Sequence, residues 1–370
     1  MKLLNKNKVQ QYAISTEARP TCYLCGGRPK VIYRDLEDRL FGTPGSWTLK
    51  QCPDSDCGLI WLDPMPTEKD IGKAYSNYYT HEDKNAQKPK KHSSTFTQLK
   101  RAFYLARNRG YLALKFDAAN EASYLDKLAG LLVYLYPARK ATLDFNAMYL
   151  LVRFGARLLE IGCGGGRQLE FLRQLGWQAE GLDLDPVAVE VASARGLTVH
   201  VGNLKQQNFP DRYFDAVVSS HVIEHVHDPV GLLRECGRIL RPSGKLVVVT
   251  PNTASWGHFW FRSNWLALDP PRHLHLFNPI SLRRAAEEAG LTVCRLTSTV
   301  RDADGLFRAS SDIQNTQRHV WGSRHPWGVR RWSKILQLAE WLLLQAGLDR
   351  GEELMMICER GIEDVRHYSK

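Results

Sequence analysis

Residues 160–166 read Glu-Ile-Gly-Cys-Gly-Gly-Gly, with glycines at positions 162, 164 and 166. An apolar strand pattern, ARLLEI, precedes this stretch, and a helical pattern, RQLEFLRQL, follows it. Glycines let the backbone turn sharply off a strand and approach a ligand closely, because no Cβ obstructs the path. A dinucleotide-binding GxGxxG loop would need a glycine at position 167, where this chain has Arg167. The stretch therefore predicts a strand, a loop and a helix that approach a ligand without forming a pyrophosphate-binding loop.

A carboxylate stands at the end of the next expected strand. The strand pattern GWQAEGLD ends at Asp183, about twenty residues after the glycines, where a carboxylate can bind two ribose hydroxyls. The glycine loop and Asp183 together imply an adenosine ligand. The alternative is a plain tight turn in some other α/β domain, because a short glycine motif alone is weak support.

Strand and helix patterns alternate in the rest of the chain. The later strand patterns are LTVHVGN, FDAVVSS, GKLVVVT and LTVCRLTSTV, and the helical patterns among them are DPVGLLRECGRIL and NPISLRRAAEEAG. This alternation predicts an α/β fold with a doubly wound sheet. A last strand, EELMMICER, begins after a polar turn.

These motifs resemble the class I methyltransferases that depend on S-adenosylmethionine, whose first motif is an acidic residue followed by GxGxG. Glu160, Gly162, Gly164 and Gly166 match that motif. The resemblance continues through NFPDRYFDAVVSSHVIEHVHDP and PSGKLVVVTPN and defines a domain over residues 151–362. It implies a seven-stranded Rossmann-like sheet with an antiparallel last strand, and S-adenosylmethionine as the cofactor.

The resemblance also implies which residues bind the cofactor. Asp183 would bind the ribose, the segment from Gly202 to Leu204 would border the adenine, and Ser219 to His221 would line the methionine end. Asn203 stands where an aspartate is commoner, but its amide can still hydrogen-bond the adenine edge. The full expected set is Glu160, Gly162, Cys163, Gly164, Gly166, Asp183, Leu184, Asn203, Leu204, Ser219, Ser220 and His221.

Length and composition favour a protein without a membrane span. The 370 residues suffice for two domains. The first residues, MKLLNKNKVQQYAISTEARP, lack an apolar stretch with a cleavage site, and the longest strongly apolar run, LAGLLVYLY, is too short to cross a bilayer. We therefore expect a cytoplasmic protein, in which the 8 cysteines stay reduced.

Four of the cysteines form two pairs near the N-terminus, Cys22 with Cys25 and Cys52 with Cys57. Four thiolates in two pairs suit tetrahedral zinc, and a closed four-sulfur site would be structural. We expect a zinc-ribbon-like module over residues 18–65, and the alternative is four reduced, unrelated thiols. A similar module precedes the catalytic domain in many methyltransferases that act on sugars and related metabolites.

Residues 66–150 are expected to form a linker and a helical cap of two or three helices, because apolar residues recur at helical spacing. The net charge is +11, and the stretch from Asp83 to Arg101 is strongly basic. This basic stretch is interpreted as a solvated linker, and an anionic lipid surface or a nucleic acid is the alternative partner. Tyr79 lies just before it and is a candidate to close the active site.

An insertion at about residues 303–350 interrupts the catalytic domain. Its sequence RHVWGSRHPWGVRRW interleaves tryptophan with arginine and leads into an amphipathic helix, WSKILQLAEWLLLQAG. Tryptophan and arginine together suit interfaces with lipid headgroups, bases or sugars. Packing of this helix onto its own domain is the simplest interpretation, and a lid or a membrane-surface role is the alternative.

Methyl transfer is an in-line displacement, so the enzyme must align the reactants and remove a proton from a hydroxyl or carbon acceptor. His225 is the first candidate base, because imidazole titrates near neutral pH, and Glu224 beside it could orient it or hold substrate. The Glu-His pair resembles that of sugar C-methyltransferases that carry the cysteine module. His273 and Tyr79 are the other candidate catalytic residues, and Arg272 could bind an anionic substrate.

The sequence therefore predicts an S-adenosylmethionine-dependent methyltransferase that acts on a small molecule such as a sugar or glycan intermediate, with oxygen favoured over carbon as the acceptor atom. A quinone or lipid-linked acceptor is an alternative, and the acceptor could be anionic or amphiphilic. A zinc-ribbon protein that binds or methylates RNA or DNA is a further alternative, which the evenly charged cysteine module does not favour. A degenerate domain that only binds the cofactor is opposed by the intact loop and Asp183. The sequence leaves the oligomeric state open.

Overall fold

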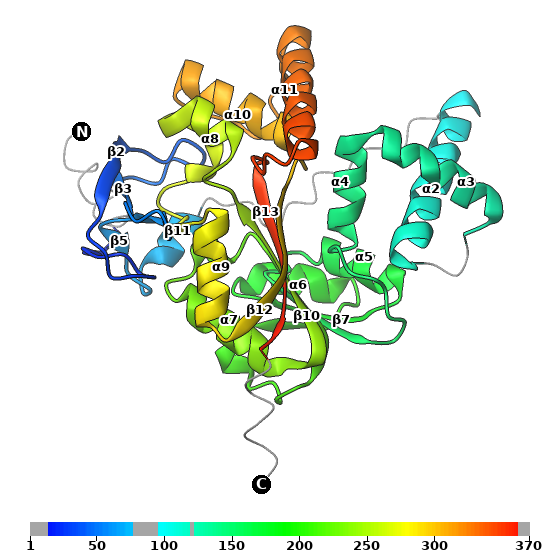
Figure 1. Ribbon diagram of the computed structural model, residues 1–370, viewed down its shortest axis with the longest axis horizontal. Helices are drawn as coiled ribbons and strands as arrows, with labels where there is room; N and C mark the ends of the chain where they lie inside the picture. The colour runs from blue at the N-terminus through cyan, green and yellow to red at the C-terminus, as the bar shows by residue number, and fades with distance from the viewer. Residues whose placement is uncertain (1–13, 77–94, 119–121, 362–370) are drawn as a thin grey trace. The chain divides into compact units, whose positions relative to one another are not determined.

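The computed structural model describes residues 14–76, 95–118 and 122–361. Its largest sheet contains seven strands in the order β12-β13-β10-β9-β6-β7-β8. Figure 1 labels β12, β13, β10 and β7 of this sheet. β6 is parallel to β7 and β9, β7 is parallel to β8, and β13 is antiparallel to β12. This sheet confirms the Rossmann-like fold with an antiparallel last strand. Its strands are β6 (Arg157–Ile161), β7 (Gln178–Asp183), β8 (Val199–Val201), β9 (Phe214–Ser220), β10 (Leu240–Pro251), β12 (Leu291–Thr299) and β13 (Glu353–Arg360).

The described residues divide into two compact units. Unit 1 takes residues 220–238 and the described parts of 1–78 and 248–370, and unit 2 takes the described part of 79–219 together with 239–247. The central strands are apolar along nearly their whole length, as in β6, where Leu158 and Leu159 are fully buried. Such continuous burial is typical of a parallel sheet that is covered on both faces.

Unit 2 begins with helices rather than strands. The helices are α2 (Thr95–Phe116), α3 (Tyr124–Leu131) and α4 (Pro137–Asn146), and α5 (Arg167–Leu175) and α6 (Pro186–Ala194) follow β6 and β7. α2 and α3 cross closely at Gly110 and Gly130, where a Cβ on either glycine would overlap the backbone of the other helix. The Gln168 side-chain amide donates to the Asn146 carbonyl at 2.7 Å, which ties α4 to the helix after the glycine loop.

The cysteine module forms part of unit 1. Its strands are β1 (Thr16–Glu17), β2 (Lys30–Leu36), β3 (Trp47–Gln51), β4 (Ile60–Leu62) and β5 (Met65–Pro66). β2, β3 and β4 make an antiparallel sheet whose fourth strand is β11 (His275–Leu276), from a segment more than two hundred residues further along the chain. The module is therefore completed by a strand that the sequence places in the catalytic domain.

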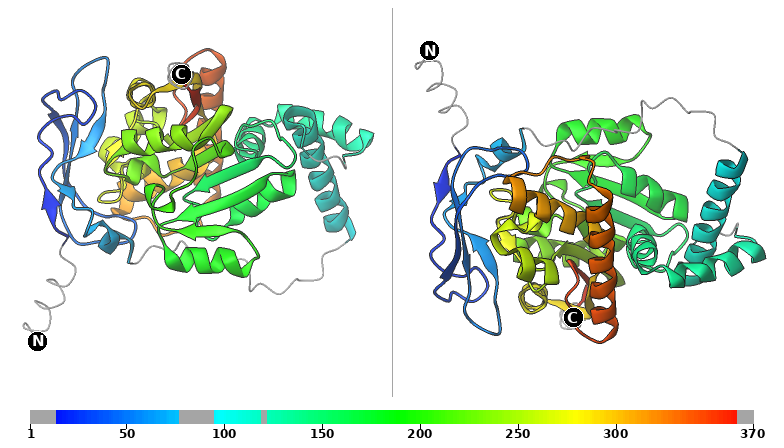
Figure 2. Two further views of the ribbon diagram at one scale, coloured as in Figure 1. Left: turned by 90° about the horizontal axis from the view of Figure 1, so that it is seen from below. Right: turned by 90° about the horizontal axis from the view of Figure 1, so that it is seen from above.

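Unit 1 also contains α7 (Pro229–Ile239), most of which lies in this unit, as well as α8 (Trp256–Phe261) and α9 (Pro279–Glu288). The insertion consists of two helices, α10 (Ala303–Thr316) and α11 (Trp327–Gln345), which pack against each other (Figure 2). α11 begins at Trp327, five residues before the amphipathic stretch noted in the sequence, because Pro326 stands in extended backbone immediately before its first turn. Among the described residues, no helix is both long and apolar enough to cross a bilayer.

Candidate functional site

The glycine loop of unit 2 has the backbone that its sequence predicts. Gly162, Gly164 and Gly166 have φ angles of 75°, 50° and 78°, in the left-handed region that side chains other than glycine rarely adopt. A Cβ at Gly166 would overlap Leu197, so this position needs glycine to bring the loop against its neighbour. A Cβ at Gly164 would meet nothing within 4 Å, which leaves open space beside the loop for a ligand.

Asp183 ends β7 directly beside this loop. Its Oδ2 accepts the Gly164 backbone N–H at 2.7 Å, and its Oδ1 accepts the Asp185 N–H at 2.9 Å. Each carboxylate oxygen has a second lone pair, so the group can still accept two hydroxyls. The loop and the carboxylate therefore hold each other in place.

Two buried polar groups near this loop have no hydrogen-bond partner among the described residues. They are Glu160 Oε2 and the Ser219 hydroxyl. Ser219 lies opposite Ile161 in the parallel β6–β9 ladder, so both groups stand where these strands end. Burial, and then the charge of Asp183, raise the pKa of Glu160 well above its usual range. Unsatisfied buried polar groups are costly, and a polar ligand at this edge would satisfy them.

The remaining residues expected at the cofactor lie on the same strands or directly after them. Cys163 is buried within the loop, Leu204 is buried, and Leu184 is exposed. Asn203 follows β8, and its side-chain oxygen accepts the Gln206 N–H at 3.0 Å. Its amide oxygen is thus engaged within its own turn. Ser220 is the last residue of β9, and His221 follows it in unit 1.

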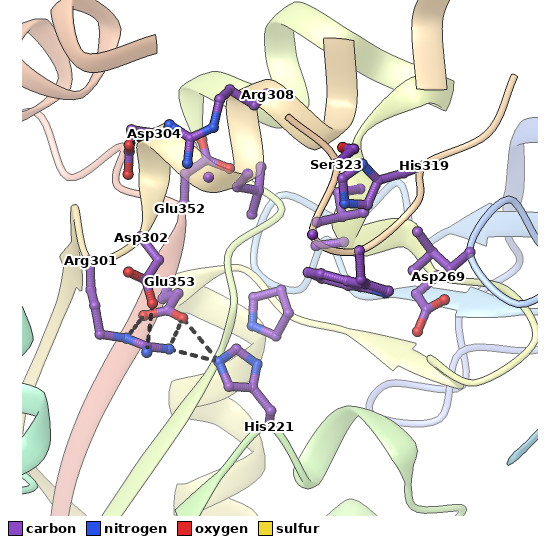
Figure 3. Close-up of a pocket in the computed structure, with 18 of the residues that line it drawn as sticks. His221, Asp269, Arg301, Asp302, Asp304, Arg308, His319, Ser323, Glu352 and Glu353 are labelled. Atoms are coloured by element: carbon purple, nitrogen blue, oxygen red, sulfur yellow. Dashed lines mark hydrogen bonds and ion pairs between the residues drawn. The ribbon is translucent and has the colours of Figure 1, made fainter. Parts of the chain in front are cut away.

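Unit 1 contains a cavity of about 560 Å³ (Figure 3). Its wall combines charged and aromatic side chains from the segments after β9, β10 and β12, from the start of β13 and from the insertion. The lining residues that carry the argument are His221, Asp269, His273, Arg301, Trp321 and Glu353.

His221 is the centre of a charged network at this cavity. Its Nδ1 is 3.2 Å from Glu224 Oε1, and its Nε2 is 2.9 Å from Glu353 Oε1. Arg301 donates from Nε to the other Glu353 oxygen at 2.9 Å. Burial alone would lower the pKa of His221, but the hydrogen bonds to the two glutamates raise it to about 10. His221 is therefore an imidazolium at neutral pH, which donates hydrogen bonds and cannot accept a proton.

Glu224 faces His221 rather than its neighbour in sequence. Besides His221, its carboxylate accepts the Thr250 hydroxyl at 3.0 Å, and its side chain is fully buried. Burial opposes ionisation, yet the hydrogen bond from His221 lowers the pKa of Glu224 to about 2. The orientation of His225 by Glu224, which the sequence allowed, does not occur, because adjacent residues point in different directions.

His225 and His273 lie with their rings 4.7 Å apart but differ in their access to the cavity. His225 Nδ1 is 3.0 Å from the Arg272 carbonyl and 2.9 Å from the Tyr75 hydroxyl, and His225 is not among the residues that line the cavity. His273 lines the cavity, and its Nδ1–H donates to the Ala267 carbonyl at 2.7 Å. Burial lowers the pKa of both rings to about 4, so both are neutral at pH 7.

The bond to Ala267 fixes the tautomer of His273. Because its Nδ1 carries the proton, its Nε2 has a free lone pair. Among the candidate bases that the structure describes, His273 alone combines a neutral ring, a fixed tautomer and a place on the cavity wall. Tyr79 lies outside the described residues.

Arg272 does not bind substrate in this arrangement. It is fully buried, and its guanidinium donates to both oxygens of Asp38 at 2.8 Å and to the Asp269 carboxylate. A further hydrogen bond runs to the Ala74 carbonyl at 3.2 Å. The expectation that Arg272 holds an anionic substrate is therefore wrong, because these partners already use its donors. Instead it ties the cysteine module to the loop after β10.

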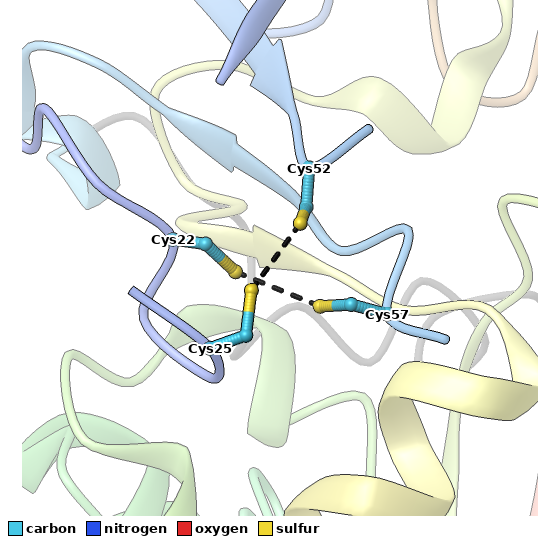
Figure 4. Close-up of side chains that lie close together, drawn as sticks. All are labelled: Cys22, Cys25, Cys52 and Cys57. Atoms are coloured by element: carbon cyan, nitrogen blue, oxygen red, sulfur yellow. Dashed lines mark hydrogen bonds between the residues drawn. The ribbon is translucent and has the colours of Figure 1, made fainter. Parts of the chain in front are cut away.

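The four paired cysteines meet at one point (Figure 4). All four Sγ atoms lie within 4.8 Å of one another, with 3.6 Å between Cys22 and Cys57 and 3.3 Å between Cys25 and Cys52. These are close to the roughly 3.8 Å that separates sulfurs around tetrahedral zinc. The hydrogen bond from Cys57 lowers the pKa of Cys22, which favours a thiolate. The donor set fits a closed structural metal site.

A second group, Glu224, His225 and His273, also brings three potential metal ligands within 4.8 Å of one another. Both oxygens of Glu224 already accept hydrogen bonds, and one of the two donors is the protonated His221. The positive charge on His221, whose Nδ1 is 3.2 Å from this carboxylate, disfavours the binding of a metal cation by the three residues. The group is better described as a hydrogen-bonded network beside the cavity.

Sequence reasoning missed several residues of the cavity wall, namely Arg301, Asp302, Asp304, Arg308, Glu352 and Glu353. One signal could have found some of them. Arg301 follows the end of β12, and Glu353 begins the antiparallel β13, so both stand at the sheet edge where open α/β folds bind ligands. Trp321, noted in the sequence as part of the insertion, also lines the cavity.

The chain is similar to known methyltransferases over part of its length. It is 41% identical over 105 residues to a ubiquinone biosynthesis O-methyltransferase of Xanthomonas oryzae, covering 26% of this chain and 44% of that protein. It is 32% identical over 167 residues to a probable S-adenosylmethionine-dependent methyltransferase of Mycolicibacterium smegmatis, covering 45% of this chain and 60% of that protein. The matched regions thus span about half the length of these relatives.

Among solved structures, an S-adenosylmethionine-dependent methyltransferase from Mesorhizobium loti aligns with a TM-score of 0.41 and 19% identity, over 59% of this chain and 97% of that chain. Comparison with family profiles matches a methyltransferase domain to residues 104–296. That match extends from α2 through the glycine loop, Asp183 and the charged network around His221 into β12, and it covers just over half of the 370 residues. The chain therefore belongs to the methyltransferase domain family.

Proposed function

We propose that this protein transfers a methyl group from S-adenosylmethionine to an oxygen atom of a small-molecule acceptor. The observation that carries the proposal is the glycine loop with Asp183 at the carboxyl ends of β6 and β7. Open space at Gly164 and the unsatisfied groups of Glu160 and Ser219 are consistent with a bound nucleoside with a polar tail. When bound, this cofactor supplies an electrophilic methyl group on a sulfonium.

The first test is calorimetric titration with S-adenosylmethionine and S-adenosylhomocysteine. Asp183→Ala should weaken binding by about 1.5 to 3 kcal/mol, the usual worth of hydrogen bonds to a charged group. Asp185→Asn is the matched control, since Asp185 caps α6 by accepting the Val187 N–H, and it should bind as the wild type does. Absence of binding to the folded wild-type protein would refute the proposal and leave the nucleic-acid alternative.

We assign the acceptor to the cavity of unit 1. Its volume of about 560 Å³ falls within the range of small-molecule sites, and it offers both charged and aromatic walls. The partial relative whose name specifies O-methylation in ubiquinone biosynthesis supports oxygen as the acceptor atom and an amphiphilic, quinol-like acceptor. Sugar and glycan intermediates remain the second candidates. A radiolabelled methyl donor offered with panels of quinols and sugars separates the two classes.

We further propose His273 as the general base. Nε2 of His273 would accept the proton of the acceptor hydroxyl, and the Ala267 carbonyl would stabilise the imidazolium that forms. The cofactor would supply the methyl group to the hydroxyl oxygen and, as its methyl–sulfur bond breaks, would leave as S-adenosylhomocysteine. His221, already protonated, would instead donate a hydrogen bond or screen negative charge on the acceptor. The Arg301–Glu353 pair holds His221 in place.

His273→Ala should leave cofactor affinity unchanged and lower kcat by about a hundredfold or more, the usual contribution of a general base. His275→Gln is a suitable control, because His275 is equally buried, and burial lowers its pKa similarly, but it lies outside the cavity wall. His225→Ala tests the first candidate from sequence. If His225→Ala abolishes turnover while His273→Ala keeps it, the base is wrongly assigned.

We also propose that the four cysteines bind one structural zinc ion. The support is their closed four-sulfur geometry, with no open coordination position for chemistry. Zinc would hold the two cysteine-bearing turns of a module whose own strands are short.

A further inference from the structure

Helix α11 buries polar side chains and exposes apolar ones, which is the reverse of what is usual for a helix on the surface of a domain. The residues it buries against unit 1 are Ser333, Gln337 and Glu340, all polar. The large apolar side chains that it exposes define the α11 outer face, which consists of Trp327, Trp332, Ile335, Leu338 and Leu342. Trp327 is 73% exposed and Ile335 is 57% exposed. A helix that belonged only to a folded domain would turn this face inward.

Specific hydrogen bonds keep the polar side of α11 inward. Gln337 donates from Nε2 to the Val300 carbonyl at 2.8 Å, and Arg308 reaches the Ser333 hydroxyl at 3.4 Å. Trp327, Ile335, Leu338 and Leu342 recur at intervals of three, four or eight residues, so they lie on one side of the helix. Ile335, Leu338 and Leu342 are each about half exposed, so covering each of them would add about 1 kcal/mol of burial energy, which favours a partner that covers this face.

The charge of the insertion indicates which kind of partner covers this face. From Ile313 to Ala339 the chain has no aspartate or glutamate, but it has five basic residues, Arg318, Arg324, Arg330, Arg331 and Lys334. The Arg331 guanidinium lies 5.2 Å from the Trp327 ring centre, so cation and indole form one group at the N-terminal end of the outer face. Tryptophan and arginine together are suited to the headgroup level of a bilayer, with aliphatic side chains below them.

We propose that the α11 outer face docks onto the surface of an anionic lipid bilayer. The helix would lie in the interface, with Ile335, Leu338 and Leu342 at the acyl boundary and the basic residues against anionic headgroups. Each basic residue near such a surface contributes about 1 kcal/mol. A second copy of this chain is a poorer occupant, because a symmetric contact would bring the same basic residues face to face.

The loop before α11 connects this surface to the cavity. Trp321, Ser323 and His325 line the cavity, and the chain continues from them directly into α11 within the same unit. Docking would therefore hold this part of the cavity wall near the bilayer, where an amphiphilic acceptor would be concentrated. This second step rests on the proposed function, whereas docking itself does not.

The test is flotation of the full-length protein with phosphatidylcholine vesicles, with and without phosphatidylglycerol. The wild type should float only with the anionic vesicles and should be released by high salt. Ile335→Ser/Leu338→Ser/Leu342→Ser and, separately, Arg330→Glu/Arg331→Glu should each weaken binding roughly tenfold or more. Phe259→Ser is the matched control, because Phe259 is also 73% exposed in unit 1, on α8, and it should bind as the wild type does.

Three results would overturn the proposal. They are equal binding to neutral vesicles, full binding by both variants, and sedimentation that shows a wild-type dimer which the triple variant dissociates without any lipid binding. Circular dichroism and thermal melting show whether the variants fold, and the charge-reversal variant carries the test if the triple variant does not. Cofactor titration in the same samples is independent of flotation, so failure of docking and failure of methyl transfer are distinguishable.

Discussion

Glu340 is a buried carboxyl group whose two oxygens have no hydrogen-bond partner among the residues that the structure describes. Burial, and then the nearby Glu352, raise its pKa well above the ordinary value of 4.5. In the folded protein the group therefore stays protonated, while in the unfolded chain it ionises above about pH 4.5. Its contribution to stability is greatest below that pH and declines as the pH rises towards its folded pKa.

Glu340→Gln should accordingly stabilise the protein, and the gain should grow between pH 5 and pH 8 by about 1 kcal/mol or more. The measurement is thermal unfolding of both proteins across this pH range. Glu287→Gln, on the exposed side of α9, is the control and should change the stability only slightly. A gain from Glu340→Gln that is the same at both pH values would show that ionisation is not its cause.

Single residues also show what can be inferred without a structure. The need for glycine at positions 162, 164 and 166 and for a carboxylate at Asp183 arises from local backbone geometry, so the sequence is sufficient to predict them. His221 has one partner nearby in sequence, Glu224, but its other partner, Glu353, lies 132 residues away, and no local pattern connects it to His221. The positions of Arg301 and Glu353 at the sheet edge could be inferred, but the ion pairs that join them to His221 could not be predicted.

At the scale of elements, α2 and α3 depend on glycine where they cross. Gly110→Ala places a methyl group against the Asp126 carbonyl, so the helices must separate, at a typical overpacking cost of about 1 to 3 kcal/mol. Hydrogen exchange should become faster for amides of α3. Gly328→Ala in α11 is the control, because a Cβ there meets nothing within 4 Å and alanine favours a helix.

Equal exchange rates in wild type and Gly110→Ala would mean that the two helices tolerate a wider separation.

The crossing also explains why helical spacing predicted the helices but not their arrangement. Apolar periodicity identifies a helix with one apolar side, and α11 shows that this side need not face the domain. Packing onto its own domain was the simplest expectation for that helix, and only contacts such as Gln337 with Val300 show its orientation.

At the scale of the whole molecule, zinc removal should affect more than the cysteine module. β11 completes the module's sheet, and Arg272 bonds to Asp38, so loss of the metal should lower the unfolding temperature of unit 1 rather than melt a separate domain. Elemental analysis should find one zinc per chain, which Cys57→Ser loses. Cys294→Ser, an exposed cysteine outside the cluster, should keep it. Zinc retained by Cys57→Ser would contradict a four-sulfur site.

The Arg272 and β11 contacts also limit how this chain can change. Asp38 in the module and Arg272 after β10 are both buried, so replacement of Arg272 leaves the Asp38 carboxylate buried without its ion-pair partner, at a cost of about 3 to 5 kcal/mol. Replacement of Asp38 leaves Arg272 with Asp269 as its remaining carboxylate partner. A chimaera that exchanges only the first 66 residues would lose both this ion pair and the partner of β11. The module and the segment from Asp269 to Leu276 therefore have to be inherited, and transplanted, together.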